Sequence, residues 1–141
     1  MPEVLTFIAE NNIGFLESRE SFLGALADNL GYSLRVVATA TTIENALSAI
    51  EATDWPFYLA SLDANLRNGD YSGDHGKQML DLLRSLRPRT VVIGYAAEPF
   101  PRTELGNTVD FDFNSRSGLD FDIKIGLLGQ AFTMAVASAA K

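Results

Sequence analysis

The sequence predicts an α/β protein, a three-layer sandwich with a parallel β-sheet between two layers of helices. Short apolar runs alternate along the chain with longer runs whose apolar residues recur at helical spacing. Such an alternation implies right-handed crossovers between parallel strands. The 141 residues, 47% hydrophobic and 21% charged, fit one globular domain over residues 1–141.

The first half of the chain predicts two strands and two helices. Residues 4–9 form an apolar run that a polar cluster ends, as expected of a buried strand. Residues 15–30 carry apolar side chains at helical spacing, and Gly31 follows them as a C-cap. Residues 34–38, rich in β-branched side chains, predict the second strand, and residues 42–50 predict the second helix.

The second half repeats this alternation around a long loop. Residues 57–62 predict the third strand, and residues 63–76, rich in Gly, Asn and Asp, predict a loop. Residues 79–86 predict the third helix, which Pro88 ends. Residues 90–97 predict a fourth, buried strand.

The last part of the chain predicts a fifth strand and a long helix. Residues 98–108 are too short for a full fourth helix, so we expect a single helical turn at residues 102–105. Residues 109–113 predict the fifth strand, and the last helix begins near Leu119 and runs almost to the end. Five strands at this length favour the flavodoxin-like strand order 2-1-3-4-5, here with a shortened fourth helix.

Composition excludes several classes of protein. No cysteine is present, which excludes a disulfide framework and suits a reducing cytoplasm. The net charge of −7, with the basic residues scattered, argues against direct binding of nucleic acid. The apolar tail at residues 123–140 is too short and too polar for a membrane span. No hydrolase triad and no nucleotide-binding glycine motif is recognisable, so we expect no enzyme activity.

Polar residues follow the first, third, fourth and fifth predicted strands. In this fold the carboxyl ends of the strands carry the working groups, close to the switch point between the first and third strands. The polar segments are "AENN" ending at Asn12, "LDANLR" around Asp63, "IGYAAEP" around Ala96 and "DFNSRS" around Arg116. In this order and over nearly the whole chain, they resemble the motifs of the receiver domains of two-component response regulators (CheY-like domains).

The resemblance implies roles for six residues. Asp63 takes the place of the phosphoacceptor aspartate. Glu10, Asp63 and the main-chain carbonyl of Asn65 take the places of ligands for Mg²⁺, a hard cation that prefers several oxygen ligands. The residues that complete the phosphoryl pocket in the family correspond here to Asn11, Ala96 and Arg116.

Those three positions depart from the family pattern. Asn11 stands where a second carboxylate is expected (shifted by one residue, Ala9 and Glu10 form the pair), so Mg²⁺ is held weakly. Ala96 lacks the expected hydroxyl; a shift by one residue places Tyr95 there instead. Arg116 replaces a lysine with a planar guanidinium, and Ser117 replaces the proline that follows it.

Three further expectations concern single groups. Arg116 pairs with Asp63, or with Asp112 or Asp120 nearby. His75, the only histidine, is a solvated loop residue. We expect the phenylalanines to be core residues: Phe7, Phe15, Phe22, Phe57, Phe111 and Phe113.

The leading hypothesis is therefore an atypical receiver, or pseudo-receiver, that signals by protein–protein contact in a two-component phosphorelay. Its expected partners are a histidine kinase, a phosphotransferase or a downstream output protein. The last helix is apolar on more than one face, which predicts a homodimer through that helix. Two alternatives stay open: a receiver still phosphorylated at Asp63, and a flavodoxin-like small-ligand binder or enzyme that uses residues 63–76.

Overall fold

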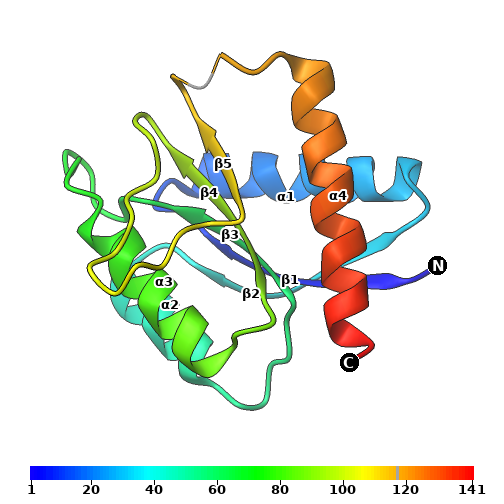
Figure 1. The fold of residues 1–141 in the computed structure, drawn as a ribbon, viewed down its shortest axis with the longest axis horizontal. Coiled ribbons are helices and arrows are strands. Elements are labelled where there is room, and N and C mark those ends of the chain that lie inside the picture. The colour runs from blue at the N-terminus through cyan, green and yellow to red at the C-terminus, as the bar shows by residue number, and fades with distance from the viewer. Residues whose placement is uncertain (117) are drawn as a thin grey trace.

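The five strands form one parallel sheet in the predicted order. The structure, a computed structural model, describes residues 1–116 and 118–141. Within them the strand order is β2-β1-β3-β4-β5, and all four pairings are parallel (Figure 1). The strands are β1 Glu3–Ala9, β2 Ser33–Ala40, β3 Leu59–Asp63, β4 Val91–Ala96 and β5 Phe111–Asn114. The predicted topology is confirmed, and the expected strand bounds differ from these by a few residues.

Four helices cover the two faces of this sheet in the described part of the chain. α2 and α3 lie side by side on one face, and α1 and α4 lie on the other (Figure 1). Side-chain oxygens of Asn12, Thr42 and Asp120 accept a hydrogen bond from the first turn of α1, α2 and α4 respectively. The helices are α1 Ile13–Asn29, α2 Ile43–Glu51, α3 Asp74–Leu86 and α4 Phe121–Ala139.

α3 begins earlier than its apolar pattern predicts. Gly73 adopts a positive φ of 77°, which turns the chain into the helix at Asp74. His75 is consequently a helical residue, only 7% exposed, and its Nδ1 accepts a hydrogen bond from the Leu66 N–H at 3.2 Å. The expectation of a solvated loop histidine was wrong, because this ring satisfies a buried backbone donor.

The segment between β4 and β5 contains no helical turn in residues 97–110, all of which are described. The expected turn at residues 102–105 is a tight turn in which the Gly106 N–H donates to the Thr103 carbonyl at 3.0 Å. Phe100 is 8% exposed and fills the space above two glycines. A Cβ added at Gly76 would lie 2.8 Å from the Phe100 ring, and one added at Gly94 would collide with it. In place of a fourth helix, the buried Phe100 side chain packs into the core here.

α4 packs on the sheet with one face only. Its buried residues are Leu128, Ala131, Phe132 and Ala135, and its outer side leaves Met134 43% exposed. The chain itself therefore leaves the outer face of this helix uncovered, and the homodimer expected through it stays a prediction. Among the described residues, no helix is both long enough and apolar enough to span a membrane.

Two of the expected core phenylalanines also lie at the surface. Phe15 and Phe22 on α1 are 64% and 41% exposed. Together with Phe121 of α4 they border an apolar groove between the two helices, with a volume of about 380 Å³. The apolar residues recur at helical spacing, which predicted the helix. That spacing did not show which side of the helix faces the sheet.

Candidate functional site

The polar residues predicted at the strand ends meet in one open cavity of about 510 Å³. It lies at the carboxyl ends of β1, β3, β4 and β5, where a parallel sheet of this order places its functional groups. Residues that follow these four strands form the floor, and residues 67–71 form a rim. Among the lining residues are Glu10, Asn11, Asp63, Asn65 and Ala96.

Asp63 is the last residue of β3 and lies half-buried in this cavity. Its Oδ1 accepts a hydrogen bond from the Asn65 N–H at 3.1 Å. Burial raises the pKa of Asp63 to about 7, and the charge and hydrogen bond of the neighbouring Glu10 carboxyl act in the same direction, against the lowering effect of Asn65. Asp63 and Glu10 therefore form a pair of carboxyl groups in mutual contact.

Glu10 is held by an arginine that does not belong to any of the predicted strand ends. It is 3% exposed, and Arg19 of α1 donates from Nη1 to its Oε2 at 3.1 Å. The Arg19 guanidinium also lies over the ring of Tyr95, with Cζ 3.8 Å from the ring centroid. The site thus contains a fixed internal cation.

A signal for Arg19 was present in the sequence. The buried residues of α1 include Leu16, Leu23 and Leu26, at helical spacing. Arg19 falls on the same stripe, three residues after Leu16 and four before Leu23. A charged residue on the apolar stripe of a helix needs a partner inside the protein, and here the partner is Glu10.

The two asparagine side chains hold the loop that follows β3. Asn11 donates from Nδ2 to Oδ1 of Asn68 at 2.9 Å, and Oδ1 of Asn65 accepts from the Gly73 N–H at 2.8 Å. Both side-chain amides are therefore engaged in shaping the rim of the cavity.

Ala96 lines the cavity, whereas the Arg116 side chain pairs outside it at the surface. Ala96 ends β4 beside Asn114, and its carbonyl accepts from the Ser115 N–H at 3.0 Å. Arg116 pairs at the surface with Glu98, Nη2 to Oε1 at 3.0 Å, rather than with Asp63. The position of Ser117 lies outside the described residues.

The other two aspartates that we expected near Arg116 are engaged elsewhere. Asp112 Oδ2 accepts from the Phe100 N–H at 2.9 Å, and Asp120 caps α4. The expectation that Arg116 pairs with an aspartate was therefore wrong.

The residues present offer Mg²⁺ few side-chain ligands, as expected of a weak site. Mg²⁺ needs near-octahedral oxygen coordination, yet only the carboxyls of Glu10 and Asp63 come together here, and Arg19 occupies an oxygen of Glu10. Within residues 1–116 and 118–141, no cluster of three or more acidic or histidine side chains suited to a metal ion was found.

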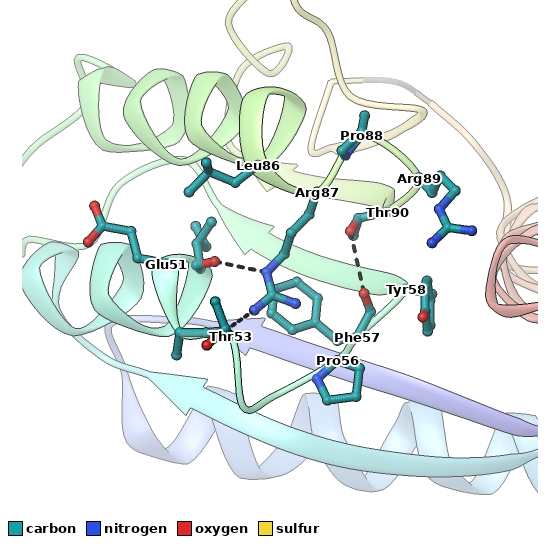
Figure 2. A pocket seen from close by; sticks show the side chains of 12 residues that line it. Glu51, Thr53, Pro56, Phe57, Tyr58, Leu86, Arg87, Pro88, Arg89 and Thr90 are labelled. Carbon is teal, nitrogen blue, oxygen red and sulfur yellow. Dashed lines mark hydrogen bonds between the residues drawn. The ribbon is translucent and has the colours of Figure 1, made fainter. Parts of the chain in front are cut away.

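A second cavity, of about 390 Å³, lies near the C-terminal ends of α2 and α3 and is shown in Figure 2. Arg87 extends across it and lies over the Phe57 ring, 4.0 Å from its centroid. Its guanidinium donates to the carbonyls of Ile50, Ala52 and Trp55. All three contacts satisfy backbone carbonyls at and after the end of α2. Arg87 therefore has a structural role, and this cavity is not a candidate binding site.

Neither a protein-family model nor a curated protein sequence matches this chain. Solved structures do match its fold. A chain of the CheX-CheY-BeF3-Mg complex from Borrelia burgdorferi is 14% identical, with a TM-score of 0.61 over 91% of this chain and 88% of that chain. The receiver domain of a DNA-binding response regulator from Colwellia psychrerythraea is 15% identical, with a TM-score of 0.60 over 89% and 95%.

A third solved structure carries another description. An adenylate cyclase from Rhodopirellula baltica is 14% identical, with a TM-score of 0.59 over 98% of this chain and 93% of that chain. At this level of identity the likeness concerns architecture alone. The chain therefore has the flavodoxin-like fold of response-regulator receiver domains.

Proposed function

We propose that this chain is a receiver-type signalling module of a two-component system that acts through protein–protein contacts and does not depend on metal-assisted phosphorylation of Asp63. The observation that carries the proposal is the ion pair between Glu10 and Arg19, which engages a carboxylate that would otherwise be free for a metal. The receiver fold supports the class of function, and the altered pocket supports the mode of action.

Phosphoryl transfer to an aspartate needs a charged nucleophile and cations that neutralise the incoming phosphoryl group. The pKa of Asp63 is raised to about 7, so a large fraction of its carboxyl carries a proton at neutral pH. Ala96 offers no hydroxyl, and the charge of Arg116 is engaged by Glu98 at the surface. Phosphoryl transfer to Asp63 is thus disfavoured by the protonated nucleophile itself and by the groups at Ala96 and Arg116.

The proposed partners are proteins: a histidine kinase, a phosphotransferase or an output protein. The groove beside the cavity, bordered by Phe15, Phe22 and Phe121, supports this, because exposed apolar patches often mark interaction sites. We expect no catalytic turnover, a cytoplasmic location and self-association through the outer face of α4.

Beryllofluoride with Mg²⁺ tests the proposal, because this phosphoryl mimic binds only where the metal and phosphoryl sites are complete. Wild-type protein and Asp63→Asn are titrated with both reagents at millimolar concentration, and backbone amide shifts are followed by NMR. We expect no saturable change in either protein. Saturable shifts around residue 63 in the wild type, abolished by Asp63→Asn, would establish the alternative, a receiver that is phosphorylated at this residue.

A further inference from the structure

We propose that the guanidinium of Arg19 is the permanent cation of the acidic pocket and keeps divalent metal ions out of it. This inference deepens the proposed function and rests on it. It concerns the cation that accompanies Glu10 and Asp63, and it assigns that role to a side chain of α1.

Two contacts fix the guanidinium in this position. It donates to Glu10 Oε2 at 3.1 Å and lies 3.8 Å from the centroid of the Tyr95 ring, and from there its charge lowers the pKa of Asp63 slightly against the larger effect of burial. The side chain of Arg19 is 16% exposed and that of Glu10 only 5%. An ion pair so shielded from water is screened little by salt.

The buried carboxylate of Glu10 needs a cation beside it, either a side chain or a metal ion. A buried carboxylate without a partner is strongly unfavourable, so either an arginine or a metal ion must accompany it. Glu10 also accepts, from the Asn12 N–H at 3.4 Å, a bond that alone does not balance a full charge. Since the Arg19 guanidinium is tethered to α1 beside the carboxylate, it outcompetes a dissolved ion at ordinary concentration.

The arginine also opposes metal binding directly. A unit charge held roughly 6 Å from a divalent ion and screened as in water changes the affinity for that ion about tenfold. Removing Arg19 should therefore both vacate an oxygen of Glu10 and remove this repulsion. Arg67 provides the matched control, because it lines the rim of the same cavity but is exposed to solvent.

The experiment is a titration with Mn²⁺ of wild type, Arg19→Gln, Arg67→Gln and the double variant Arg19→Gln with Glu10→Gln. Paramagnetic broadening of the amides around residues 10 and 63 measures the dissociation constant. We expect Arg19→Gln to bind Mn²⁺ about tenfold more tightly than wild type or more. Arg67→Gln should stay within about twofold of wild type, because exposed charges are screened. The double variant should lose the gain.

Thermal unfolding with and without Mg²⁺ is the second readout. Arg19→Gln should be less stable than wild type, and Mg²⁺ should restore part of this loss, because a ligand of the folded state stabilises it. If Arg19→Gln does not fold in the absence of metal, recovery of its folded spectrum with Mg²⁺ supports the inference, and failure to recover overturns it. Equal Mn²⁺ affinity of Arg19→Gln and Arg67→Gln overturns this inference alone, whereas a beryllofluoride response of the wild type overturns both the inference and the proposed function.

Discussion

Replacing Asp63 with asparagine should stabilise this protein at neutral pH. The folded state holds Asp63 with a pKa of about 7, against an ordinary aspartate value of 3.8. As pH rises through this window, the unfolded chain releases a proton that the folded protein keeps, so the free energy of unfolding falls. Asparagine keeps an oxygen for the Asn65 N–H and an amide that can donate to Glu10, as protonated Asp63 does.

The size of the effect follows from the pKa difference. At 1.36 kcal/mol per pH unit, a rise from 3.8 to about 7 corresponds to an upper bound of about 4 kcal/mol. Because Asp63 lies in an open cavity, solvent screening reduces this to about 1–2 kcal/mol. For a domain of this length the expected rise in Tm is about 4–8 °C.

The assay is urea or thermal unfolding of wild type and Asp63→Asn between pH 4 and pH 8.5. The difference in stability should grow from about pH 4 to pH 7 and stay constant above it. Asp70→Asn is the control, because hydrogen bonds from Ser72 lower the pKa of Asp70 and its removal should act in the opposite direction. Curves for wild type and Asp63→Asn that run parallel across this pH range would refute the reasoning.

Three further predictions concern the remodelled parts of the fold. Phe100→Ala should lower the free energy of unfolding by about 3–5 kcal/mol, since it empties a buried aromatic site; Leu105→Ala, 79% exposed in the same segment, should change it by less than about 0.5 kcal/mol. Asn11→Asp with Ala96→Thr should strengthen Mg²⁺ binding in a calorimetric titration, and unchanged affinity would mean that these are not pocket positions. Sedimentation at micromolar concentration should give a mass above the 15.3 kDa of one chain, and Met134→Glu should return it to that value; a wild-type mass of one chain would exclude the dimer.

The sheet was predictable because its strands obey simple rules. Buried parallel strands read as short apolar runs, and each run ends where polar residues begin, as at Glu10 and Asp63. The alternation of strands and helices along the chain then implies parallel pairing, and the chain length limits the strand order to a few choices. These rules depend on local pattern and on chain geometry, so one sequence is enough to apply them.

Two segments could not be predicted because tertiary contacts decide them. The first turns of α3 carry polar residues and glycine, and what stabilises them is a backbone turn at Gly73 and a hydrogen bond from Leu66 to His75. Between β4 and β5, Phe100 packs into space left by Gly76 and Gly94, which are distant in sequence. Local propensity contains no information about either contact.

The candidate site also has a part that the sequence predicted and a part that tertiary contacts decide. The positions of Glu10 and Asp63 follow from the fold, because the carboxyl ends of adjacent parallel strands meet. Arg116 stands at the predicted strand end, yet its side chain turns outward to Glu98, so position alone did not determine its contact. Arg19 comes from a helix, and a strand-end search does not reach it. A buried carboxylate such as Glu10 requires a buried cation nearby. Arg19 is a charged residue on the buried stripe of α1, so the sequence already indicated it as that cation.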